Sequence, residues 1–111
     1  MTVEKLKDIL GETGYPVAYD HFSTENPPVP PYLAFRTAYT NNFFADNIVS
    51  KIVAHIELEL CAGKKKDPEA EKRLTDILTA NKIAWQKTDE GFVESDGLFS
   101  VFYEFEEVMD E

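Results

Sequence analysis

The most regular pattern of apolar and polar residues lies in the middle of the chain, between Asn47 and Cys61. Apolar and polar side chains alternate there residue by residue, which is typical of a β-strand with two different faces. The predicted core face carries Ile52, Ala54, Ile56, Leu58 and Leu60, and the opposite face carries Val53, His55, Glu57, Glu59 and Cys61. A strand of about fifteen residues would be roughly 50 Å long, whereas strands usually have five or six residues. We therefore expect the first part of this strand to project from the body as a hairpin arm, at residues 40–50.

Two further strands are predicted before it. Val17–Phe22 is plausible as a first strand, and Tyr32–Thr40 has the aromatic and β-branched content of a second. The face that we assign to the core in this second strand carries Leu33, Phe35 and Tyr39. The prolines at 27, 28, 30 and 31 exclude a central strand between the two, because proline donates no ladder hydrogen bond. They predict a stiff connector, and Asn41–Asp46 resembles a turn or a flared loop.

Two helices are predicted from apolar stripes and capping residues. In Thr2–Thr13 the threonine at the start can act as N-cap, and Gly14 can supply a left-handed stop. The second helix, Pro68–Ala80, begins after an aspartate cap at Asp67, with proline at its first position. Its core-facing stripe is Ala70, Leu74, Ile77 and Leu78.

The C-terminal part of the chain predicts more strands. Ile83–Thr88 and Gly91–Glu94 are predicted as short strands on either side of a hairpin turn at residues 89–91. A last strand, Leu98–Val108, follows a turn at residues 95–97. Its expected core face carries Phe99, Val101, Tyr103 and Phe105. Helices and strands do not alternate regularly, so the pattern favours an α+β fold: a mainly antiparallel sheet with two helices packed on one face.

Length and charge narrow the possible functions. A chain of 111 residues predicts a single domain, with residues 108–111 as an acidic tail. Its 21 acidic and 11 basic residues give a net charge of −10, which repels nucleic-acid phosphates. The sequence offers no apolar leader and no apolar run long enough for a bilayer, so we expect a cytosolic protein that does not enter membranes.

The residues that could carry chemistry do not form a recognisable catalytic or metal motif. His21, His55 and Cys61 are too few and too widely spaced along the chain for a zinc site. The acidic pair Glu57 and Glu59 is better interpreted as a solvated strand face than as a general acid–base pair. We interpret Lys64–Lys66 as a solvated turn. The sequence thus predicts no enzyme activity and no cofactor.

Phe43 and Phe44 are the strongest candidates for a functional role. The pair is flanked on both sides by asparagines and lies at the start of the overlong strand. An exposed aromatic pair usually marks a protein–protein contact, although burial of both rings in the core is the alternative. The candidate subunit interface comprises Phe43, Phe44, Asp46, Asn47 and Val49.

Several stretches together resemble small structural proteins of long-tailed bacteriophages and prophages. The first are Tyr15–Phe22 ("YPVAYDHF"), Pro30–Phe35 ("PPYLAF") and Asn42–Asn47 ("NFFADN"). The later ones are the stretch from Ile56 to Leu74 and the stretch from Phe92 to Phe105. The resemblance runs from Leu6 to Phe105, and its motifs are structural rather than catalytic.

The resemblance implies a tail-completion protein, either a tail-terminator or a head–tail joining subunit. Such proteins have an α+β fold, act as rings that are commonly hexameric, and carry no activity or cofactor. The implied partners are other copies of the chain, the tail tube and head-completion proteins. The implied location is the host bacterial cytoplasm during assembly and then the head–tail junction of the virion. The alternative is a generic acidic intracellular interaction module without catalytic activity.

Overall fold

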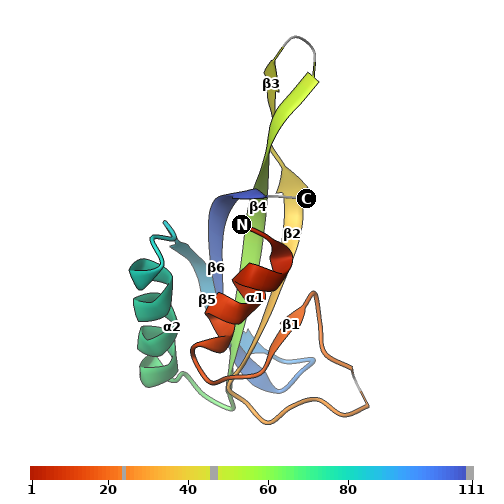
Figure 1. The fold of residues 1–111 in the computed structure, drawn as a ribbon. Coiled ribbons are helices and arrows are strands. Elements are labelled where there is room, and N and C mark those ends of the chain that lie inside the picture. Colours follow the sequence, from red (N-terminus) through yellow and green to blue (C-terminus); the bar gives the residue numbers. More distant parts are fainter. Residues whose placement is uncertain (24, 46–47, 110–111) are drawn as a thin grey trace.

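The computed structural model describes residues 1–23, 25–45 and 48–109 and shows an α+β fold (Figure 1). Two helices and a mostly antiparallel sheet make up this part of the chain. The elements in chain order are α1 (Val3–Gly11), β1 (Val17–Tyr19), β2 (Tyr32–Thr40), β3 (Phe43–Ala45), β4 (Ile48–Gly63), α2 (Pro68–Ala80), β5 (Gln86–Val93) and β6 (Leu98–Met109). The predicted fold class is therefore confirmed.

The sheet is built around the long strand β4. Its strand order is β1-β2-β4-β6-β5, and β3 pairs with the beginning of β4 outside this path. All neighbours are antiparallel except β1 and β2, which run parallel. The parallel pair is possible because the proline-containing connection at residues 20–31 carries the chain back to the start of β2. The strand β4 lies at the centre because its alternating pattern gives it one apolar face to bury.

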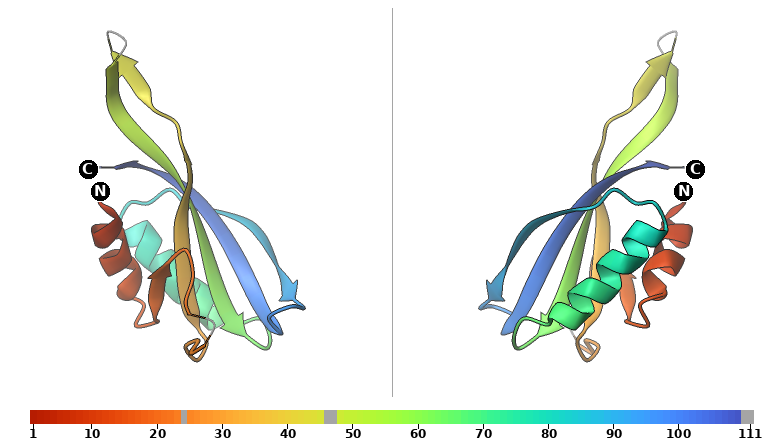
Figure 2. Two further views of the ribbon diagram at one scale, coloured as in Figure 1. Left: turned by 90° about the vertical axis from the view of Figure 1, so that its right-hand side faces the viewer. Right: turned by 90° about the vertical axis from the view of Figure 1, so that its left-hand side faces the viewer.

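Both helices cover the same face of the sheet (Figure 2). The hydrophobic core between helices and sheet contains Leu6, Ile9 and Leu10 of α1, Ala70, Leu74 and Leu78 of α2, Leu33 and Phe35 of β2, Ala54, Ile56, Leu58 and Leu60 of β4, Val101, Tyr103 and Phe105 of β6, and Ile83. These residues confirm the core faces predicted for β4, β6 and α2, with Ile52, Ile77 and Phe99 half-buried at the margin. On the opposite face of β4, Val53 and Cys61 are buried as well.

The predicted N-caps are present at both helices. The Oγ1 atom of Thr2 accepts a hydrogen bond from the backbone N–H of Lys5 at 3.0 Å. In the same way Oδ1 of Asp67 accepts from Ala70 N–H at 3.1 Å. Gly14 takes the left-handed conformation, with φ +83°, that ends the first helical segment. Each cap satisfies a backbone donor that has no partner inside its helix.

Three strand predictions are wrong, and two of them fail at β-bulges. A bulge between Thr37 and Tyr39 turns Tyr39 away from the core face that it was predicted to share with Leu33 and Phe35. A second bulge, between Lys87 and Asp89, lets β5 continue through residues 89–91, where a hairpin turn was expected. The first strand ends at Tyr19 rather than Phe22, because Asp20 has a positive φ of 68°. The turn before β6 is where it was predicted, with Gly97 at φ +68°.

The segment predicted as a turn or flared loop at Asn41–Asp46 contains the strand β3 instead. Its pairing with β4 makes a two-stranded extension of the sheet. At the other end of the chain, Val108 and Met109 belong to β6, and residues 110 and 111 lie outside the described part. None of the described helices is long and apolar enough to cross a membrane.

Candidate interaction site

The extension of the sheet forms an arm, which we define as β3 together with Ile48–Lys51 of β4. It continues the β2–β4 hairpin. Asn41 N–H donates to the carbonyl oxygen of Val53 at 2.7 Å, and beyond this point β4 pairs with β3 instead of β2. Phe43 pairs with Lys51, and Ala45 pairs with Ile48. Figure 1 shows the arm reaching away from the helices and from the other strands. The two strands of the arm pair with each other and with no other strand of the sheet in the described residues.

Large apolar side chains on the arm are exposed. The exposed fraction is 61% for Phe43, 69% for Phe44 and 69% for Ile48. Two of these side chains belong to β3 and the third to β4, so both strands of the arm present apolar surface to solvent. The alternative in which both rings belong to the core is excluded by these exposures.

Of the other predicted interface residues, the structure describes only one. The backbone of Val49 pairs with that of Phe44, so this residue belongs to the arm. Asp46 and Asn47 lie outside the described residues. The structure adds Ile48, which the sequence analysis did not select because it was counted with the regular alternation of the long strand.

The root of the arm is held by an aromatic stack. Because of the bulge, Tyr39 lies opposite His55, and their rings stack with centroids 4.6 Å apart and an interplanar angle of 5°. Nε2 of His55 lies 3.4 Å from a carboxylate oxygen of Glu104, and its Nδ1 lies 3.7 Å from one of Glu106. The sequence offered no signal for this stack, since a bulge has no side-chain pattern of its own.

The residues considered for chemistry are not brought together. His21 is exposed and contacts its neighbour Asp20 at 2.7 Å. Cys61 is buried beside Tyr32, and burial raises the pKa of its thiol, which disfavours the reactive thiolate. His55 is on the same strand face as Cys61 but six residues away, at the other end of the sheet. Within the described residues no group of three or more histidine, cysteine or acidic side chains is placed to hold a metal ion.

The acidic pair of β4 is engaged in separate contacts. Glu57 accepts from Nη2 of Arg36 through both carboxylate oxygens, at 3.1 and 3.3 Å. Glu59 accepts from the hydroxyl of Ser100 at 2.7 Å. Both residues are half-buried, on the strand face that was predicted to be solvated. Their distinct partners give them structural roles on the face of the sheet that the helices leave uncovered.

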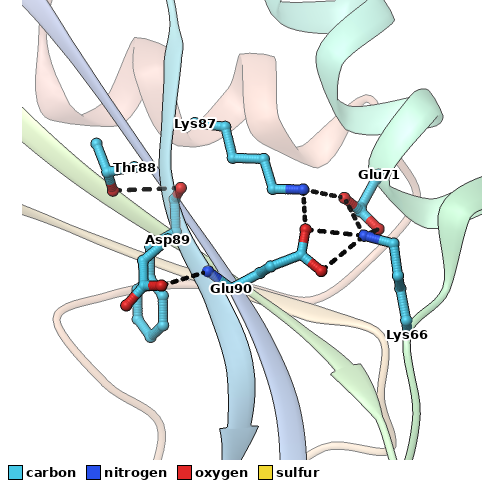
Figure 3. Close-up of polar contacts among 7 residues, drawn as sticks. Lys66, Glu71, Lys87, Thr88, Asp89 and Glu90 are labelled. Atoms are coloured by element: carbon cyan, nitrogen blue, oxygen red, sulfur yellow. Dashed lines mark hydrogen bonds and ion pairs between the residues drawn. The ribbon is translucent and has the colours of Figure 1, made fainter.

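One charged cluster was not expected from the sequence (Figure 3). Lys66, assigned to a solvated turn, contacts both Glu71 of α2 and Glu90 of β5, each at 2.9 Å. Lys87 contacts the same two carboxylates. The bulge in β5 places Lys87 and Glu90 on one side of the strand, so the cluster ties the start of α2 to the edge of the sheet. The charged groups of this cluster therefore contact one another and stabilise the helix on the sheet. The arm remains the candidate interaction site.

Comparison with models of known protein families and with curated proteins finds no match to this chain.

Proposed function

We propose that this protein is a structural assembly subunit that joins neighbouring molecules through its arm. The observation that carries the proposal is the exposure of Phe43, Phe44 and Ile48 on a hairpin that extends beyond the body. Aromatic side chains dominate the binding energy of protein interfaces, and exposed groups of them mark contact sites. A projecting hairpin also suits a head-to-tail contact, in which one surface of a subunit grips a different surface of the next.

The resemblance to small phage structural proteins extends this proposal. It makes the chain a tail-completion or tail-terminator subunit that forms a ring at the junction of head and tail, without catalytic activity or cofactor. Two features support this role. The exposed arm supplies an element that reaches a neighbour, and the net charge of −10 lets DNA pass a ring without adhering to it. The partners would be other copies of the chain, the tail tube and head-completion proteins.

Self-association measured by sedimentation tests the arm. We expect the wild-type protein to form larger species as its concentration rises, and the double variant Phe43→Ser/Phe44→Ser to remain monomeric. Truncation of a hot-spot side chain at an interface costs about 2 kcal/mol of binding free energy or more. The double variant should keep the thermal stability of the wild type within a few degrees, because both rings are exposed in the isolated subunit.

Phe92→Ser is the matched control. It removes another exposed phenylalanine, which lies on β5 rather than on the arm. This variant should assemble like the wild type. Equal loss of assembly in the control would mean that general surface hydrophobicity, and not the arm, drives association.

The alternative function is an acidic interaction module that binds other proteins but not itself. It predicts a monomer at every concentration, with or without the arm substitutions. The genes that flank the coding sequence separate the two functions independently: neighbours for portal, capsid and tail-tube proteins agree with the tail-completion role, whereas unrelated neighbours favour the interaction module.

A further inference from the structure

In the described part of the chain no helix covers the face of the sheet opposite α1 and α2 (Figure 2), and the connection after β1 reaches over one end of it, where Phe22 contacts Tyr32. We call it the open face. Its side chains come from the positions of β2, β4, β5 and β6 that alternate with the core positions. In the centre, Phe102 of β6 is half-buried, with Glu59 of β4 on one side and Asp89 of β5 on the other. An aromatic side chain thus occupies the middle of a largely polar surface.

Two shallow hollows flank Phe102. One, of about 270 Å³, lies over β2 and β4 and is lined by Asp20, Ala34, Arg36, Glu57, Glu59 and Phe102. The other, of about 250 Å³, lies over β6 and β5 and is lined by Glu57, Thr88, Asp89, Phe102 and Glu104. Glu57 and Phe102 line both hollows, so the two hollows adjoin each other on the open face.

The charges that line these hollows are predominantly negative. Arg36 is the basic residue among the lining side chains, and it already contacts Glu57. Asp89 and Glu104 line the second hollow, which has no basic side chain in its lining. The surface therefore combines an aromatic ring with an excess of carboxylates in two recesses.

We propose that the open face binds a basic segment of another protein, with one arginine or lysine side chain in each hollow and the chain crossing over Phe102. Charge complementarity identifies the occupant, because guanidinium and ammonium groups pair with carboxylates and also pack on aromatic rings. Because the hollows adjoin, we place the two basic side chains at residues i and i+2 of an extended segment, which point to the same side about 7 Å apart.

The same charges exclude other occupants. Nucleic acid would bring phosphates against Glu57, Asp89 and Glu104. Two open faces of this protein would bring like charges together, which disfavours a symmetric face-to-face dimer. The inference does not rest on the proposed function, since the arm and the open face are different surfaces.

Titration with a defined peptide, followed by amide NMR shifts at low salt, tests the proposal. The probe is the capped peptide Ser-Gln-Ser-Arg-Gln-Arg-Ser-Gln-Ser, and the matched probe replaces both arginines by glutamate. We expect the arginine peptide to shift amides around Phe102 on β4, β5 and β6, and the glutamate peptide to shift none. Affinity should fall as salt is added, because exposed charge pairs are screened.

Two charge-matched double variants locate the site. Asp89→Asn/Glu104→Gln should weaken binding by about fivefold to tenfold, since each exposed ion pair contributes modestly. Glu4→Gln/Asp8→Asn removes the same charge from exposed positions of α1 and should weaken it less than about twofold. Phe43→Ser/Phe44→Ser should bind the peptide like the wild type, which separates this proposal from the role of the arm.

Several outcomes would overturn the proposal. Equal weakening in the two charge variants would show that only net charge matters. Peptide shifts confined to α1 or the arm would place binding elsewhere. Concentration-dependent shifts around Phe102 in spectra without peptide would make a second copy of this chain the occupant, with its exposed Lys64 and Lys65 as the source of positive charge.

Discussion

The ring of Tyr39 lies flat on the imidazole of His55, with centroids 4.6 Å apart, at the point where the arm leaves the body. This contact depends on the β-bulge between Thr37 and Tyr39, where β2 has one more residue than the paired part of β4. Without the bulge, Tyr39 would lie on the side of the helices. The stack links β2 and β4 close to the point where β3 replaces β2 as the pairing partner of β4. It is therefore suited to fix the direction of the arm.

We predict that the Tyr39–His55 stack stabilises the folded protein by about 0.5–1.5 kcal/mol. A double-mutant cycle with Tyr39→Ala and His55→Ala, followed by urea unfolding, measures this coupling directly. Phe92→Ala is a suitable reference, because Phe92 and Tyr39 are equally exposed, at 54% each. A coupling free energy near zero in the cycle would mean that the two rings are merely adjacent.

Two isoleucines on the same strand provide a second prediction. Ile56 is fully buried in the core, and Ile48 is 69% exposed on the arm. Ile56→Ala should lower the free energy of unfolding by about 2–5 kcal/mol, because it leaves a cavity under both helices. Ile48→Ala should change it by less than about 0.5 kcal/mol. Urea midpoints with unchanged slopes would give both values, and similar losses at the two positions would contradict the separation of arm and core.

The cap of α2 gives a third prediction. Asp67→Ala removes the carboxylate that accepts from Ala70 N–H and should cost about 1 kcal/mol of stability. The thermal midpoint should fall by roughly 4–8 °C for a domain of this size. Asp8→Ala, an exposed aspartate within α1, serves as control. An unchanged midpoint in the Asp67 variant would mean that the helix draws no stability from this cap.

Much of the fold could be predicted because local patterns and tertiary structure agree. Alternation in β4 and β6 identified the buried faces, and the caps at Thr2 and Asp67 placed both helix starts within a residue. The turn at Gly97 was visible as well, because glycine adopts its positive φ at no steric cost. In each case the signal lies within a few residues of the feature that it predicts.

The features that escaped prediction depend on pairing between distant segments. A bulge inserts a residue without leaving a pattern, so neither the outward position of Tyr39 nor the continuity of β5 could be read from alternation. The exposed pair Phe43 and Phe44 was found because polar neighbours surround it, but the strand that they form depends on β4 as its partner. Lys66 contacts Glu90 of β5, which lies 24 residues further along the chain.

The last prediction concerns pH and the cluster of Figure 3. Hydrogen bonds from Lys87 and Lys66 hold the pKa of Glu90 below its ordinary value of 4.5. In the unfolded chain this carboxylate takes up a proton at a higher pH than in the folded one, so stability rises with pH between the two pKa values. The contribution of Glu90 should be complete above pH 4.5 and should be lost as the pH falls through the lower folded value.

Urea unfolding of the wild type and of Glu90→Gln at pH 7, 5, 4 and 3 measures this contribution. The wild type should be the more stable of the two at pH 7, and the difference should shrink below about pH 4.5. Molar salt at pH 7 should also reduce the difference, because Lys66 and Lys87 are exposed and their attraction to Glu90 is screened. Glu94→Gln removes an acid at the adjoining turn and should change stability at pH 7 by less than about 0.5 kcal/mol. A difference between wild type and Glu90→Gln that stays constant from pH 7 to pH 3 would show that the side chain acts through packing, and that its ion pairs with Lys66 and Lys87 contribute nothing to stability.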